Sequence, residues 1–199
     1  MRNILLVSWL LLPIGAWAYH EGPGQDRMAF DATDAVLVAA HQAADQGNWK
    51  NAVSLYEEAL GKLPRQEETS ITRSAVQRLQ IELNKARMQA SGLPTARAEL
   101  DTLVEQMEAD ATTDKKLLTD ARQALARSQF FTTWLMRLEG LERDAWEPEI
   151  EAARQNWRLL AEQAGSEAEA ATHRADLEAS IRLARLEIED LQGLPLPSE

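Results

Sequence analysis

The feature that most limits the fold of this chain is the stretch from Asp34 to Pro64, DAVLVAAHQAADQGNWKNAVSLYEEALGKLP. It holds two segments in which apolar residues recur at helical spacing, residues 35–45 and 49–63. The sequence QGN at 46–48 separates them and is typical of a turn. The stretch therefore predicts a helical hairpin. Because one hairpin cannot bury its apolar face alone, it also requires further helices.

Small side chains stand where the two predicted helices would cross. They are Ala40, Ala43, Ala52 and Ala59. A small side chain lets two helix axes approach to about 8 Å. The large residues expected to fill the rest of the seam are Trp49, Leu55 and Tyr56.

The second half of this hairpin resembles a tetratricopeptide repeat, a 34-residue helix-turn-helix unit. Residues 52–56 read A-x3-Y, and Ala59 and Pro64 follow at the spacing of the A-x3-F…P half of that repeat. The first half departs from the family, because residues 36–43 read V-x2-A-A-x2-A where the repeat has W-x2-L-G-x2-Y. An ordinary hairpin of a helical bundle is the alternative interpretation.

The first residues predict a secretory signal peptide at residues 1–18. Arg2 precedes an apolar run that ends in Ala-Trp-Ala at 16–18, with small residues at the two positions that a signal peptidase requires. Cleavage there would make the protein secreted or periplasmic. The alternative is a retained membrane anchor, but the run is shorter than the roughly 20 residues of a comfortable span and contains Pro13 and Gly15.

The composition excludes several classes of site and partner. The chain has no cysteine, which excludes disulfides, a thiol nucleophile and thiolate metal sites. Without residues 1–18, 20 basic residues stand against 32 acidic ones, a formal charge of −12. Nucleic acid is therefore not expected as a partner, since it requires a basic face. No later segment is apolar enough to span a membrane after signal cleavage.

Turn signals divide the remaining chain into further helices. A flexible lead is expected at residues 19–30, with Phe30 and Asp31 as staple and cap of the first helix. A helical domain is expected over residues 31–192 and a flexible tail over 193–199. The predicted helix ends are marked by Ser91-Gly92, Gly140 and Gly165, and the predicted starts by Pro94, by Asp144 with Pro148 in the first turn, and by Ser166.

The fifth predicted helix begins at Lys115 and carries the longest apolar stripe: Leu118, Ala121, Leu125, Ser128, Phe131, Leu135 and Leu138. The last helix has a narrow stripe that runs to Ile188 and Leu191, with charges elsewhere, as a capping helix requires. No segment has the alternation of a strand. We therefore expect an all-α fold, a tetratricopeptide-like α-solenoid of about seven helices, built as three antiparallel pairs and a C-terminal capping helix.

Residues suited to catalysis or metal binding are few. No spacing brings two imidazoles to one metal among the three histidines, which are His20, His41 and His173. A cluster around Trp146 resembles the acids of a glycosidase, but a helix N-terminus favours acidic side chains as well; its members are Asp144, Glu147, Glu149 and Glu151. We expect no cofactor, no metal and no enzymatic activity. The alternative is a carboxylate-based polysaccharide or cell-wall enzyme on a helical solenoid.

The resemblance implies binding of a protein or peptide, because tetratricopeptide arrays hold extended peptides or partner helices on the first helix of each pair. On this chain the first such helix would display Asp34, Leu37, His41 and Asp45. Leu37 and His41 stand where chaperone-binding members have lysine and asparagine, so that ligand is disfavoured. The expected function is a scaffold that organises a cell-envelope complex, with a groove that continues along the third and fifth helices. A homo-oligomeric structural protein is a further alternative.

Overall fold

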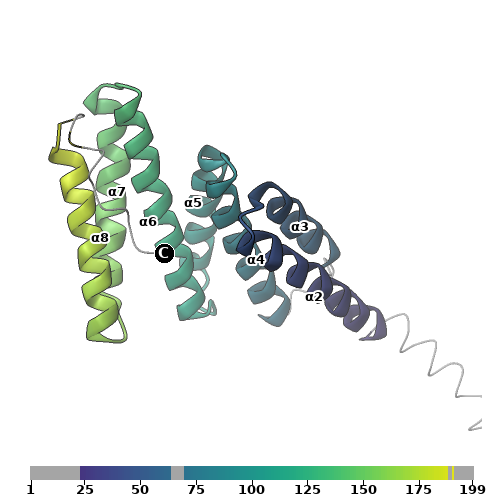
Figure 1. Ribbon diagram of the computed structural model, residues 1–199. Helices are drawn as coiled ribbons and strands as arrows, with labels where there is room; N and C mark the ends of the chain where they lie inside the picture. Colours follow the sequence, from purple (N-terminus) through teal and green to yellow (C-terminus); the bar gives the residue numbers. More distant parts are fainter. Residues whose placement is uncertain (1–22, 64–69, 188–189, 191–199) are drawn as a thin grey trace, which may run out of the picture. The chain divides into compact units, whose positions relative to one another are not determined.

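The computed structural model describes residues 23–63, 70–187 and 190, and these residues form seven α-helices and no strand (Figure 1). The expected all-α fold is confirmed. The expected signal peptide at 1–18 and the expected tail at 193–199 lie outside the described residues. The helices divide into two compact units, residues 1–76 and 77–199, and the division falls within α4 (Ser70–Gln89).

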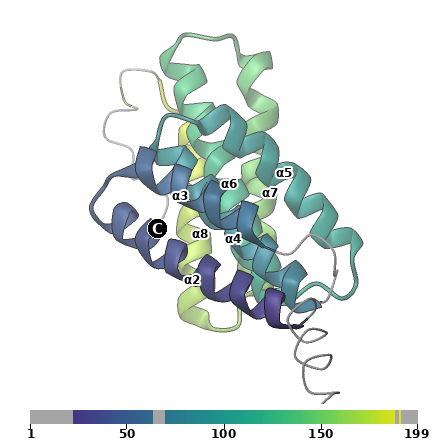
Figure 2. The ribbon, with the colours of Figure 1, turned by 90° about the vertical axis from the view of Figure 1, so that its right-hand side faces the viewer.

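The first unit is the predicted hairpin, made of α2 (Pro23–Asp45) and α3 (Trp49–Lys62). The two helices pack along each other and lie side by side in both views (Figures 1 and 2). Gly47 takes a φ of +71° in the turn, and the side chain of Asn48 accepts a hydrogen bond from the backbone N–H of Asn51. All four alanines predicted for the seam are buried: Ala40, Ala43, Ala52 and Ala59.

The start of α2 differs from the expectation. The helix begins at Pro23, so residues 23–30 are helical where a flexible lead was expected, and Asp31 lies inside the helix and not at its cap. Proline is well suited to the first turn of a helix, and residues 25–29, QDRMA, are tolerated helix formers without a glycine or a proline. Apolar periodicity marks only the part of a helix that packs, so it misses this extension.

The second unit continues from α4 through α5 (Leu93–Ala109), α6 (Lys115–Leu138), α7 (Arg143–Gln163) and α8 (Glu167–Arg185). Helices α5 to α8 stand side by side in chain order (Figure 1). Most of the predicted ends are confirmed. Pro148 is an exception, because α7 begins at Arg143 and places this proline in the second turn, where its missing N–H removes one bond of the helix.

Helix α6 is shared by two hydrophobic clusters of the second unit. Its N-terminal half packs with α4 and α5 in a cluster that contains Ile81, Leu100, Met107, Ala121 and Leu125. Its C-terminal half packs with α7 and α8 in a cluster that contains Phe130, Ile150, Trp157, Ala179 and Leu183. The helix therefore contacts neighbours on different sides along its length.

This change of partner makes the predicted stripe of α6 wrong at its C-terminal end. Ala121, Leu125 and Ser128 are buried as expected, but Leu135 and Leu138 are 43% and 44% exposed. Thr133 and Arg137 are buried in that half instead. The periodicity of one helix does not reveal where the neighbouring helix stops covering it.

Two buried arginines connect α6 to its neighbours. Near the start of α6, Arg122 donates to Glu108 of α5 at 2.6 Å and to Gln163 of α7 at 3.3 Å. Near its end, Arg137 donates to the backbone carbonyls of Leu183 and Leu186, the latter at 2.6 Å. Arg137 thus satisfies carbonyls at the C-terminus of α8 that have no partner within the helix.

The end of α8 is a second departure from the expectation. The helix ends at Arg185 and Leu186 is extended, so α8 stops before the positions Ile188 and Leu191 that the predicted stripe included. Those two residues lie outside the described part of the chain. A side chain from another helix, Arg137, stabilises this end, and sequence periodicity within α8 does not contain that information.

Candidate functional site

The face of α2 predicted to bind a partner carries Asp34, Leu37, His41 and Asp45, which are three or four positions apart and therefore share one side of the helix. Asp34, His41 and Asp45 are exposed, and Leu37 is half-buried at the edge of the seam. Val38, on the same side, is 56% exposed. The face combines two carboxylates, an imidazole and two aliphatic side chains.

His41 is held by a contact with the second helix of the hairpin. Its ring lies edge-on to that of Tyr56, with 5.8 Å between the centroids and an angle of 67° between the planes. Tyr56 itself is buried in the seam. The imidazole of His41 is therefore exposed to solvent, while one edge of its surroundings is formed by the ring of a core residue.

A pocket of about 310 Å³ lies between α4 and the start of α6 in the second unit. Its buried apolar residues are Ile81 and Leu117. Charged residues of both signs surround them: Arg78, Glu82, Asp114, Lys116 and Asp120. Asp114 is also the N-cap of α6, accepting from the N–H of Leu117 at 2.9 Å. The sequence pattern indicates no residue of this pocket as functional, although a groove along these two helices is expected from it.

A second pocket, of about 480 Å³, lies between α4 and α5 and is lined mainly by uncharged polar side chains: Gln80, Asn84, Thr102 and Gln106, with Glu99, Ala98 and Leu103. Asn84 is buried and donates to the carbonyl of Gln80 at 3.0 Å. Its side-chain oxygen accepts from Arg87 at 3.4 Å. The amide is thus satisfied within α4 and maintains the helix surface beside this pocket.

The acidic cluster around Trp146 is organised by ion pairs with different arginines. Glu147 pairs with Arg143 at 2.5 Å, Glu149 with Arg97 at 3.0 Å and Glu151 with Arg154 at 2.7 Å. The hydrogen bond to Glu147 raises the pKa of Arg143. Each of these three glutamates therefore has a cationic partner of its own, as expected of structural and surface ion pairs.

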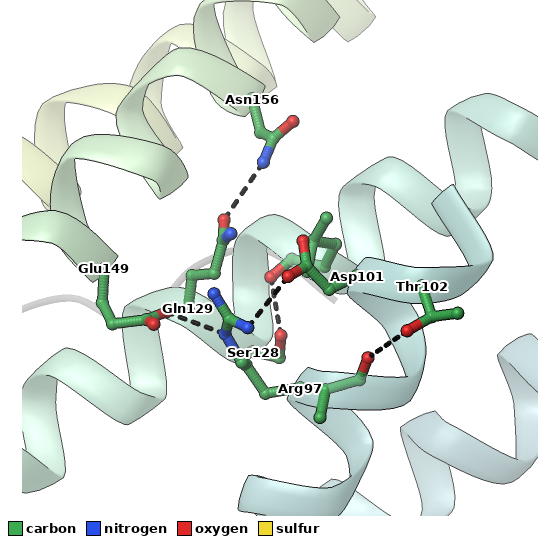
Figure 3. Close-up of polar contacts among 9 residues, drawn as sticks. Arg97, Asp101, Thr102, Ser128, Gln129, Glu149 and Asn156 are labelled. Atoms are coloured by element: carbon green, nitrogen blue, oxygen red, sulfur yellow. Dashed lines mark hydrogen bonds and ion pairs between the residues drawn. The ribbon is translucent and has the colours of Figure 1, made fainter. Parts of the chain in front are cut away.

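One of those pairs joins two helices that flank α6. Figure 3 shows Arg97 of α5 between Asp101 of its own helix and Glu149 of α7, each 3.0 Å away. Beside it, the side-chain amide of Asn156 on α7 donates to the side-chain oxygen of Gln129 on α6 at 3.1 Å. These contacts fix α5, α6 and α7 as one arrangement, which we interpret as structural.

The tryptophans of the described residues have different surroundings. Trp157 is fully buried and stacks on His173 with 5.9 Å between ring centroids. Trp146 is buried, with the guanidinium of Arg137 4.9 Å from its ring centroid. Trp134 is half-buried and packs on the cluster of α6, α7 and α8. Trp49 is also half-buried.

An exposed apolar stripe follows the end of α6 and consists of Leu135, Leu138 and Leu141. Their spacing of three residues places Leu135 and Leu138 on one helix face, and Leu141 follows in the turn after Gly140, whose φ is +74°. We refer to these three residues as the leucine stripe. Helical spacing predicts Leu135 and Leu138 as core residues, so this surface is not evident from the sequence.

No protein-family model, curated protein or solved structure matches this chain. Among the helices of the described residues, none combines the length and the apolar content that crossing a membrane requires. The part of the chain that the structure describes also contains no group of three or more His, Asp or Glu side chains placed to hold a metal ion.

Proposed function

We propose that this chain is a tetratricopeptide-like scaffold that binds a protein or peptide partner without enzymatic activity, in a secreted or periplasmic location. The first unit supplies the main support. Ala52 and Ala59, which stand at the spacing of the repeat's second half, are buried in the seam, and the opposite side of α2 is accessible. The location is inferred from residues 1–18 alone.

The chemistry of the α2 face indicates the kind of partner. Asp34 and Asp45 lie eleven residues apart on one side of α2, about 16 Å along the axis at 1.5 Å per residue, with Leu37, Val38 and His41 between them. A partner segment with an apolar residue between two basic residues would match this order of charges. The paired acids favour a basic partner, in keeping with the acidic balance of the whole chain.

The alternative of a polysaccharide or cell-wall enzyme has no observation in its favour among the described residues. Its candidates were the carboxylates around Trp146, and Glu147, Glu149 and Glu151 each hold an arginine. A glycosidase requires two carboxyl groups that face each other across one cleft, whereas these glutamates are each engaged by a separate arginine. These pairs support the scaffold proposal.

The decisive experiment compares three forms of the full chain in crosslinking affinity capture from the native source. The double variant Leu37→Ala/His41→Ala should lose at least tenfold of the partner captured by the wild type. The control is Gln42→Ala, since Gln42 is exposed and lies about 100° around the helix from His41. The control should retain capture.

Circular dichroism of the same three proteins separates binding from folding. The double variant should lose no more than about 1 kcal/mol of unfolding free energy, because His41 is exposed and Leu37 is half-buried. Equal capture by the double variant and the wild type would refute the α2 face as the binding surface. Unfolding of the double variant would show instead that these residues belong to the core.

A further inference from the structure

The pocket between α4 and the start of α6 combines an apolar floor with carboxylates that are partly withdrawn from solvent. Its floor consists of Ile81 of α4 and Leu117 of α6, which are both buried. Glu82 on α4 and Asp120 on α6 line the same pocket and are half-buried. The volume of about 310 Å³ is at the lower end of the range for small-molecule sites, so the pocket suits a single side chain better than a cofactor.

The three acids of this pocket differ in how far they are already engaged. Asp114 accepts from the backbone N–H of Leu117 and caps α6. Glu82 pairs with Lys85 of its own helix at 2.9 Å, and such a partly exposed pair is worth little, so Glu82 can exchange this partner for another. Asp120 has no hydrogen-bond or ion-pair partner within the described part of the chain. Glu82 and Asp120 are therefore the carboxylates available to a ligand.

The two cations of the pocket lie farther out than these carboxylates. Arg78 and Lys116 are exposed to solvent, where water and salt screen their charges, whereas half-buried charges are screened less. A group inside the pocket therefore experiences mainly the negative charge of Glu82 and Asp120. The N-terminal end of α6 would attract an anion, but Asp114 already occupies that position.

We propose that this pocket binds the arginine side chain of a peptide or protein partner. The alkyl part of the arginine packs on Ile81 and Leu117, and its guanidinium contacts Glu82 and Asp120. Arginine fits better than lysine, because a guanidinium presents five donors in one plane and is more weakly hydrated than an ammonium group. The site uses residues of the second unit alone, so it goes beyond the α2 face and does not depend on it.

Nuclear magnetic resonance titration of the full chain with blocked tripeptides tests this proposal. Acetyl-Ala-Arg-Ala-amide should shift the backbone amide signals of Ile81, Leu117 and Asp120 in a saturable way. The same peptide with citrulline, the neutral isostere of arginine, should bind about tenfold more weakly, because it lacks the charge-assisted hydrogen bonds. A peptide with glutamate in place of the arginine should show no saturable shift.

Two substitutions with opposite expected effects identify the charges that act on the ligand. Asp120→Asn should weaken binding of the arginine peptide about tenfold, since it removes a half-buried negative charge. Lys116→Gln should strengthen that binding about twofold, since it removes a like charge from the rim. The control is Glu162→Gln, which removes an exposed acid of α7 outside the pocket and should leave the affinity unchanged.

Three results would overturn the proposal. Equal binding of the arginine and citrulline peptides would show that the pocket recognises only the apolar part of the side chain. Saturable binding of the glutamate peptide, strengthened by Asp120→Asn, would show an anion site. Equal weakening by Asp120→Asn and Glu162→Gln would show that the overall negative charge of the chain attracts the peptide. Circular dichroism checks that each variant is folded, and if Asp120→Asn is not, the citrulline and Lys116→Gln results decide.

Discussion

At the scale of single residues, the polar side chains inside the second unit determine how its helices end and meet. Arg122 and Arg137 are buried in α6. Arg122 donates to Glu108 of α5 and Gln163 of α7, and Arg137 donates to two carbonyls at the C-terminal end of α8. Burying a guanidinium is costly unless it is hydrogen-bonded, so these contacts favour specific positions for the partner helices, although Nε of Arg122 has no hydrogen-bond partner among the described residues. Apolar periodicity assigns an arginine to the surface of a helix, so the sequence pattern predicts neither of them as buried.

The substitution Arg137→Met should destabilise the end of α8. It keeps the length of the side chain but leaves the carbonyls of Leu183 and Leu186 without their donor, at a cost of about 1–3 kcal/mol. Urea unfolding followed by circular dichroism measures the loss. Arg143→Met is the matched control, because Arg143 also lies near Trp146 but is exposed and pairs only along its own helix. Similar losses for both variants would show that the capping contact has no specific effect.

At the scale of the helix, α6 shows how tertiary contacts divide an apolar pattern. The stripe from Leu118 to Leu138 is continuous in sequence. Its first half packs against α4 and α5, whereas its leucines in the last turns are exposed. In the last turns the buried face turns toward α7 and α8, where Phe130 and Thr133 are enclosed. The buried side of a helix is set by the helices around it at each level.

This division predicts unequal costs for the same substitution at two positions of α6. Leu125→Ser removes a buried side chain and should cost about 3 kcal/mol or more, whereas Leu138→Ser should cost less than about 1 kcal/mol because the leucine is 44% exposed. Thermal and urea unfolding of the two variants measure the difference. If Leu138→Ser lowered the free energy of unfolding as much as Leu125→Ser, Leu138 would be a buried residue and the prediction would be wrong.

At the scale of the whole molecule, the two units bury different kinds of side chain. Among the described residues of the first unit, the buried apolar residues are mostly alanine, with Tyr56 and Leu63 as the large ones. The second unit buries tryptophan, phenylalanine and many branched aliphatic residues in its two clusters. Since apolar burial contributes roughly in proportion to its area, the described part of the second unit has the larger stabilising contribution.

Hydrogen exchange should therefore show two levels of protection. The backbone amides of α2 and α3 are expected to exchange through openings of lower free energy than those of α6 and α7, because local stability follows the apolar contacts that an opening breaks. Mass spectrometry of peptic fragments, at increasing but sub-denaturing urea, resolves the two regions. A single protection level across all these helices would mean that the units unfold only together.

The candidate site could be predicted from the sequence only where a local pattern defines it. The side of α2 that bears Asp34 and His41 follows from helical spacing, and the seam alanines indicate which side is covered. The pocket of α4 and α6 and the leucine stripe were not identified, because each depends on which segments become neighbours. The contact of His41 with Tyr56 likewise requires the hairpin to be closed.

The sequence by itself determined the helical class, the turn at residues 46–48, the ends of most helices and the small residues of the seam. These features depend on local rules, namely apolar spacing, capping side chains and the conformational freedom of glycine. Only the tertiary structure decided that Arg137 binds the carbonyls at the end of α8, that Glu149 pairs with Arg97 and that Leu138 is exposed. Such contacts join residues 46 to 52 positions apart or depend on the relative lengths of two helices, and no local pattern encodes either.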